Sequence, residues 1–180
     1  MPSTLHLHPN PFALGWEKLP PHLRSSLPPQ TLSHLSLFPP DFPDLELLPF
    51  ANGAPPPSYK NHSPSSNYAT FAVGILTPKS RGNVTIKSVD TRDMPVVDPN
   101  FLGDEEGIDE SLAVQGVKRV REWAEGTGIV VEEVSPGVDV ETEEEIRGWI
   151  REVGALVFHG MGTCELPFGI TDIVLLTRRM

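Results

Sequence analysis

The segment Phe158–Cys164, which reads Phe-His-Gly-Met-Gly-Thr-Cys, holds the residues best suited to chemistry in this chain of 180 residues. Its histidine, His159, belongs to a residue type with an unperturbed pKa near ~6.5, so a neutral imidazole can accept a proton at neutral pH. Gly160 and Gly162 follow, and they allow the backbone to approach a bulky or planar molecule because no side chain intervenes. The pattern predicts that His159 is a general base on a glycine-rich loop.

Two other interpretations of this segment exist. Taken by itself, His159 would be a structural histidine whose ring is satisfied by a backbone carbonyl. Cys164 is the only cysteine and cannot form an internal disulfide; a small buried apolar role suits it better than a reactive thiol. A metal site formed by His6, His8, His159 and Cys164 lacks the close ligand spacing of known motifs, so we predict no metal.

Several sequence blocks precede the loop in a fixed order. They are Asn67–Thr70 with the apolar run to Leu76, Pro78–Ile86, Pro95–Leu102, a helix containing Lys118–Arg121, and the helix that leads into Phe158–Cys164. Together they span about residues 65–164 and resemble the C-terminal part of the glucose–methanol–choline (GMC) family of flavin-dependent oxidoreductases. The resemblance implies FAD as cofactor, a small-molecule alcohol oxidised at its CH–OH group, His159 as the base and Phe158 in the substrate pocket.

The sequence departs from the family pattern at two places. A dinucleotide-binding unit is marked by G-x-G-x-x-G after a strand, and this chain has no such motif, so its FAD-binding residues are unknown. The family carries a second catalytic histidine or asparagine after the loop, whereas here residues 165–180 form a divergent tail. We therefore expect a fragment truncated at both ends that is inactive alone.

Periodicity predicts an α+β fold with an antiparallel sheet, flanking helices and a proline-rich extended N-terminal arm. Residues 68–76 and 83–89 are expected to form a hairpin, residues 94–99 a short extended piece and residues 129–134 a short strand. Residues 108–125 follow the three-and-four spacing of an amphipathic helix that ends at glycines. A capping box of Thr142 and Glu145 opens a second helix that Gly154 ends. We expect Arg81 and Asp98 to be structural and Trp123 and Trp149 to lie in the core.

Composition divides the chain into three regions. Residues 1–64 contain fifteen of the 20 prolines, so they are expected to form an arm with short helical turns and neither long helices nor central strands. Residues 65–164 form the family-like domain, and residues 165–180 the tail. The apolar residues of the arm require another surface on which to pack.

Charge excludes some partners. The net charge is −10 and the chain has no basic stripe, which excludes a nucleic-acid partner. The N-terminal residues resemble no signal peptide, and no apolar run approaches the ~20 residues of a membrane span, so we predict no membrane partner. Two alternatives to an oxidoreductase remain: a non-catalytic remnant that binds a partner through an exposed sheet edge and apolar arm, and an independent acidic domain that shares the blocks.

Overall fold

The computed structural model describes residues 13–51, 53, 66–155 and 172–179, and for 172–179 it describes the backbone. In chain order the elements are β1 (Gly15–Glu17), α1 (Pro21–Arg24), α2 (Pro29–Leu35), β2 (Leu45–Phe50), β3 (Tyr68–Ile75), β4 (Asn83–Thr85), β5 (Val96–Asp98), α3 (Ile108–Gly126), β6 (Glu132–Ser135), α4 (Glu143–Val153) and β7 (Asp172–Arg179). The α+β prediction is confirmed. No helix among these elements is long and apolar enough to cross a membrane.

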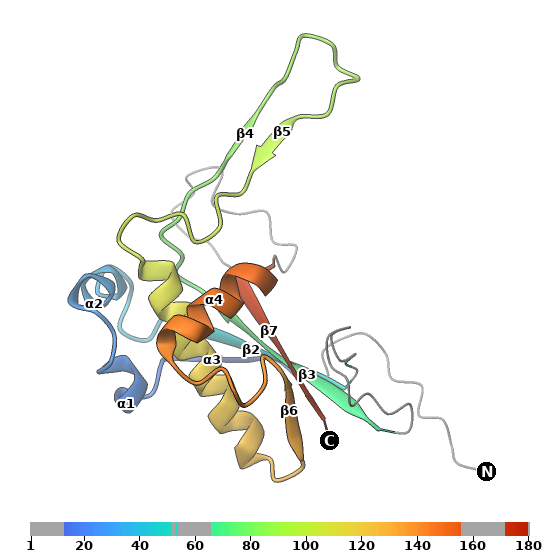
Figure 1. The fold of residues 1–180 in the computed structure, drawn as a ribbon. Coiled ribbons are helices and arrows are strands. Elements are labelled where there is room, and N and C mark those ends of the chain that lie inside the picture. The colour runs from blue at the N-terminus through green and yellow to red at the C-terminus, as the bar shows by residue number, and fades with distance from the viewer. Residues whose placement is uncertain (1–12, 52, 54–65, 156–171, 180) are drawn as a thin grey trace.

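The main sheet has the order β1-β2-β3-β7-β6, and neighbouring strands are antiparallel (Figure 1). The predicted strand over residues 68–76 is β3, but its predicted hairpin with residues 83–89 was wrong. Both edges of β3 are taken by β2 and β7, and β4 pairs with β5 in a separate two-stranded sheet. The Asp109 carboxylate accepts the backbone N–H groups of Lys79 and Ser80, so the chain after β3 turns toward α3 instead of folding back.

The described part of the proline-rich segment contributes two strands and two short helices. α1 and α2 each begin at a proline, Pro21 and Pro29, where the missing N–H costs no helical hydrogen bond. The expected short helical turns are therefore confirmed. The expectation of no central strand was wrong for β2, which lies between β1 and β3. Its Pro49 lies beyond the pairing with β1, which ends at Leu47, so the missing N–H can face the side that β1 leaves open.

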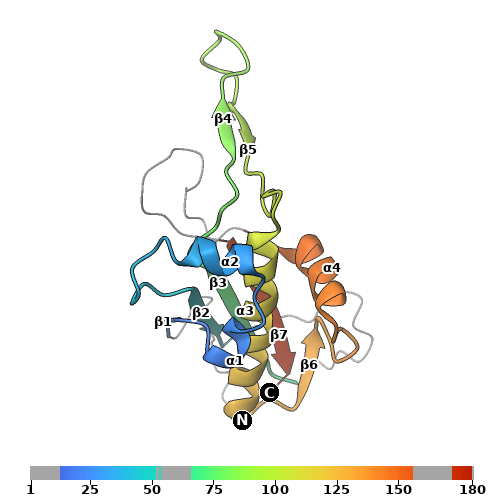
Figure 2. The ribbon, with the colours of Figure 1, turned by 90° about the vertical axis from the view of Figure 1, so that its left-hand side faces the viewer.

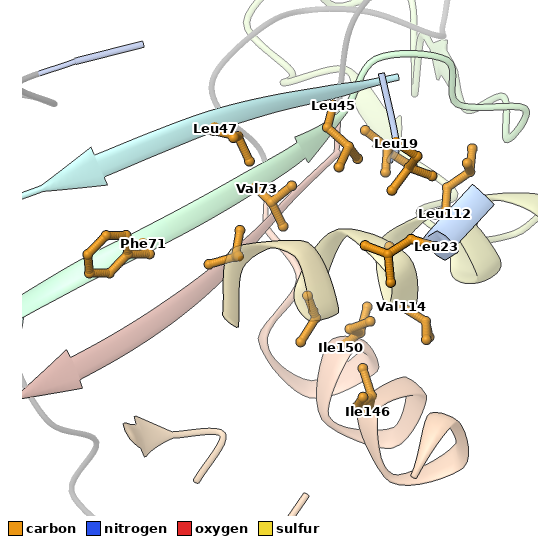
Figure 3. Packing of buried hydrophobic residues seen from close by; sticks show 14 of the residues in the cluster. Leu19, Leu23, Leu45, Leu47, Phe71, Val73, Leu112, Val114, Ile146 and Ile150 are labelled. Carbon is orange, nitrogen blue, oxygen red and sulfur yellow. The ribbon is translucent and has the colours of Figure 1, made fainter. Parts of the chain in front are cut away.

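The hydrophobic core lies between the sheet and α3, and α1, α2 and α4 contribute to it (Figures 2 and 3). Buried side chains on α3 recur every three or four residues and face Leu45, Phe71 and Val73 of the sheet. The helix comes close to the sheet at Gly116, where a Cβ atom would lie 3.2 Å from a methyl group of Val73. The buried members on α3 are Ile108, Leu112, Ala113, Val114, Val117, Val120 and Ala124.

Both predicted helices form. α3 covers the expected residues, and α4 opens with the predicted capping box, in which the Glu145 N–H donates to the Thr142 hydroxyl and the Glu145 carboxylate accepts from the Thr142 N–H. Trp123 packs edge-on against Phe71 with ring centroids 5.2 Å apart, and Trp149 is half-buried beside the core. The strand expected over residues 129–134 is the shorter β6.

The tail contains an interior strand. β7 pairs with β3 on one side and with β6 on the other, so residues 172–179 join β6 to the rest of the sheet. The region that we predicted to be a divergent tail therefore contains a strand that completes the sheet.

Candidate functional site

The predicted site residues His159 and Phe158 fall in residues 156–171, together with Cys164, outside the described parts of the chain. Their roles stay predictions. The structure does describe both ends of this segment. The segment follows α4, whose C-cap is Gly154, and it leads into Asp172, the first residue of β7.

The end at α4 is fixed because α4 is bound to α3 near both of its termini. Glu143 accepts hydrogen bonds from Lys118 Nζ at 2.7 Å and from Gln115 Nε2 at 3.1 Å. The hydrogen bond from Lys118 holds the pKa of the Glu143 carboxyl below its ordinary value. Near the other terminus, Arg151 donates two hydrogen bonds to Glu110, at 2.6 and 2.9 Å. The direction in which the chain leaves α4 is therefore set by α3.

The end at β7 is fixed by the sheet. Asp172 is paired with Ile75, the last residue of β3. Two residues beyond Ile75, the carbonyl of Thr77 lies 2.8 Å from Nε2 of His34 on α2. The segment that contains His159 thus leads into β7 beside the end of β3, and the residues that follow β3 are bonded to α2.

The face of the sheet opposite α3 carries a polar group that the sequence analysis missed. Leu45 and Leu47 of β2 point into the core, so the alternating residues Glu46 and Leu48 lie on the opposite face. Glu46 is 7% exposed, and within the described residues its carboxylate has no hydrogen-bond or ion-pair partner. Side chains of a strand alternate between its two faces, so the sequence Leu45-Glu46-Leu47 could have placed Glu46 on the face opposite the two leucines.

Arg81 and Asp98 have the structural roles that we predicted. The Arg81 guanidinium donates to the carbonyls of Pro78, Lys79 and Ser80. The Asp98 carboxylate accepts the N–H of Asn100 at 3.0 Å. These bonds shape the turns on either side of the β4–β5 pair.

A cavity of about 480 Å³ lies beside the last turns of α4, next to β6 and the turn that follows it. Trp149, Glu152 and Val153 line one side. On the other side, Glu133 is bound to Arg121 at 2.8 Å, so one of the lining carboxylates is already neutralised. In the described ranges, no group of three or more His, Cys, Asp or Glu side chains is arranged to hold a metal ion.

Comparison with known proteins identifies the family. The family model described as GMC oxidoreductase, for its C-terminal domain, matches residues 78–172, more than half of the chain. The chain belongs to the GMC oxidoreductase family. The match includes the β4–β5 pair, α3, α4 and the whole of residues 156–171, and it ends at the first residue of β7.

Similar GMC proteins include the glucose methanol choline oxidoreductase atC of Aspergillus terreus, which is 37% identical over 85% of this chain and 24% of its own length. Patulin synthase of Penicillium expansum is 36% identical over 91% of the chain and 27% of its own length. Choline oxidase of Arthrobacter globiformis is 40% identical over 57% of the chain and 19% of its own length. The chain spans about a quarter of the length of the first two relatives.

GMC oxidoreductases are generally FAD flavoproteins, so the described residues can be tested as an FAD site. Every strand pairing among them is antiparallel. A dinucleotide-binding unit requires two parallel strands joined by a helix, with the pyrophosphate at the helix N-terminus. The described part of this GMC chain therefore offers no cradle for the dinucleotide, in keeping with the missing glycine motif.

Asp109 is a second residue that the sequence analysis missed. It is fully buried, and its two carboxylate oxygens accept the N–H groups of Lys79 and Ser80 at 2.6 and 2.9 Å. An aspartate in the first turn of a helix signals interaction with backbone N–H groups. The sequence alone gave no indication that these groups would come from a segment thirty residues earlier.

Proposed function

We propose that this chain is the substrate-domain part of an FAD-dependent oxidoreductase that acts on the CH–OH group of an alcohol, with His159 as general base. The observation that carries the proposal is the family match over residues 78–172, which includes His159. The names of relatives such as choline oxidase and the glucose methanol choline oxidoreductase atC support an oxidoreductase and leave the substrate of this chain open.

The chemistry assigned to the chain is proton transfer. Oxidation of an alcohol to a carbonyl compound removes the hydroxyl proton and a hydride from the carbinol carbon. Neutral His159 accepts the proton, which favours alkoxide formation and so eases loss of the hydride. FAD, when bound, supplies the hydride acceptor. Phe158 forms an apolar wall that orients the alcohol, and Gly160 and Gly162 permit close approach of the substrate.

We also propose that the chain is inactive by itself, since its described residues lack a dinucleotide cradle. The purified chain, incubated with FAD and a panel of primary alcohols and then desalted, is expected to retain no stoichiometric flavin and to turn over no alcohol. Bound flavin at one per chain together with turnover would contradict this.

The role of His159 can be tested in a fusion in which this chain replaces the matched part of patulin synthase. His159→Gln is expected to lower kcat by a factor of about 10²–10⁴, the usual contribution of a general base. The matched control is His22→Gln, because His22 is exposed and pairs with Glu122 on the body. Equal kcat for the fusion and its His159→Gln variant would exclude His159 as the base.

An alternative proposal is a non-catalytic chain that binds a partner. The observation that favours it is the exposed apolar surface of β4 and β5, where Val84, Val96 and Val97 are each about half exposed. Binding of a partner protein by the same fusion, without flavin-dependent turnover of an alcohol, would support this alternative.

A further inference from the structure

The strand β4 has the sequence Asn83-Val84-Thr85, which is an acceptor triplet for N-linked glycosylation. Such a triplet needs an asparagine, a second residue other than proline, and a serine or threonine in the third place. Among the asparagines that the structure describes, only Asn83 stands in one. Because the pattern is short and recurs by chance, its place in the fold decides whether a glycan can be attached and carried.

Asn83 lies in the part of the molecule that is most open to solvent. The β4–β5 pair projects away from the five-stranded sheet and its helices, and every residue from 83 to 98 is exposed (Figures 1 and 2). An N-linked glycan is bulky and hydrated, so it requires a position on the surface. The exposed side chain of Asn83 meets this requirement.

The two side chains that the transfer reaction uses are accessible. Among the described residues, the Asn83 side chain makes a single hydrogen bond, from Nδ2 to a carboxylate oxygen of Asp98 at 3.5 Å, which is longer than the usual ~2.7–3.2 Å. The Thr85 hydroxyl has no hydrogen-bond partner within the same residues. Side chains two residues apart in a strand share a face, so the amide and the hydroxyl are presented together.

The backbone of the triplet can be released without loss of the core. β4 and β5 pair over three residues each, in a sheet separate from the main one. An isolated pair of strands is marginally stable in water, and local opening of such a pair costs little free energy. An enzyme can therefore bind residues 83–85 in its active site while the five-stranded sheet stays folded.

A glycan at this position would also cover an apolar surface. Cross-strand partners share a face, so Asn83 lies on the same face as Asp98 and Val96. Val96 is 48% exposed, and exposed apolar side chains promote association between chains. A hydrated glycan on Asn83 would shield Val96 and leave the opposite face, with Val84 and Val97, accessible.

We propose that Asn83 carries an N-linked glycan, and hence that the protein passes through the secretory pathway. In the transfer, Nδ2 of Asn83 attacks the anomeric carbon of the first sugar of a lipid-linked oligosaccharide diphosphate. The bond from that carbon to the diphosphate oxygen breaks, the lipid diphosphate leaves with the electron pair, and Nδ2 gives up one proton to the transferase. The second N–H of Nδ2 remains and can still donate to Asp98. The inference does not depend on the proposed oxidoreductase activity.

Mass spectrometry of the protein purified from its source organism tests the proposal. The denatured protein is treated with peptide-N-glycosidase in heavy-oxygen water, which converts a glycosylated asparagine to a labelled aspartate, and is then digested with trypsin in ordinary water. Cleavage after Arg81 and Lys87 releases the peptide Gly82–Lys87. We expect label in most copies of this peptide. An unlabelled peptide, while other glycoproteins of the same extract are labelled, would overturn the proposal.

Variants secreted from a eukaryotic host separate this site from the second triplet of the chain, Asn61-His62-Ser63. Asn83→Gln and Thr85→Ala should each lose one glycan from the intact mass, whereas Thr85→Ser keeps the hydroxyl and should retain it. The matched control is Asn61→Gln, which should leave the label in Gly82–Lys87 unchanged. Label in that peptide from Thr85→Ala, or an intact mass that Asn83→Gln does not lower, would contradict the assignment.

Discussion

The molecule has two contrasting regions: the five-stranded sheet with its helices, here called the body, and residues 83–98 with β4 and β5, here called the ribbon. They place the same kinds of apolar residue in opposite environments. In the body, Leu112 and Ile150 are almost completely buried between elements far apart in the sequence, whereas Ile86 and Val89 on the ribbon are almost completely exposed. All four of these residues fall within the same family match. The difference shows that this stretch of sequence encodes two kinds of surface: one that is buried in a core, and one that the described residues leave exposed.

The largest expected effect separates the two regions directly. Leu112→Ala should lower the free energy of unfolding by about 2–5 kcal/mol, because a fully buried leucine leaves a cavity. Ile86→Ala should change it by less than about 0.5 kcal/mol, because the side chain is already solvated. Urea denaturation followed by far-UV circular dichroism measures both. Similar losses for the two variants would mean that the ribbon is covered within the chain itself.

The next largest effect concerns the hydrogen bonds that attach the base of the ribbon to α3. Asp109→Ala leaves the N–H groups of Lys79 and Ser80 without their acceptor and should cost about 1.5–3 kcal/mol, as for hydrogen bonds to a charged group. Asp109→Asn keeps one acceptor oxygen and should cost less. Hydrogen exchange at the two amides is the measurement. Unchanged protection in Asp109→Ala would show that Asp109 does not anchor the ribbon.

A smaller effect is expected where the two ribbon strands meet. Gly82→Ala forces a methyl group against the Asp98 carbonyl and should cost about 1–3 kcal/mol, the usual range for overpacking. Gly126→Ala is the matched control, because a Cβ at Gly126 has no neighbour within 4 Å. NMR shifts of Val84 and Val97 would report whether the strands separate. A Gly82→Ala chain with native shifts and stability would contradict the close approach.

The smallest effect lies in the body, at the start of α4. Thr142→Ala should cost about 0.5–2 kcal/mol by removing the N-cap. Hydrogen bonds from the Thr142 N–H and hydroxyl lower the pKa of the Glu145 carboxyl below its ordinary 4.5. A depressed pKa stabilises the fold above the unfolded-state pKa, and the contribution disappears as the pH falls through the folded-state value. Thr142→Ala keeps the bond from the backbone N–H, the larger cause, and removes the bond from the hydroxyl, so acid titration of stability should be slightly flatter in the variant. An unchanged slope would show that the hydroxyl does not stabilise the charged carboxylate.

Local patterns in the sequence predicted the helices well. The three-and-four spacing located α3, and the pair Thr142 and Glu145 located the start of α4, since both signals act within one or two turns of chain. The pairing of β3 could not be predicted in the same way. Its partners β2 and β7 are distant in the sequence, and the turn signal at residues 78–82 depends on Asp109, which the sequence places thirty residues later.

The candidate site was identified from residue types and family resemblance, and not from geometry. The histidine and glycines of residues 158–164 indicate proton transfer. The local sequence does not indicate which other parts of the molecule contact this segment. The structure adds the two anchors of the segment, at Gly154 and Asp172, and the buried Glu46 on the face of the sheet opposite α3. Such information depends on long-range packing, which single-residue patterns do not encode.

The interior position of β7 has a consequence for how the protein is made. The ribosome synthesises β7 after all the other described strands, yet β7 must enter between β3 and β6. Until β7 emerges, one edge of β3 offers unpaired backbone groups, and such an edge recruits strands from other chains. Messages that terminate before the codons of β7 would therefore release chains with an unpaired edge on β3, and we expect these products to aggregate.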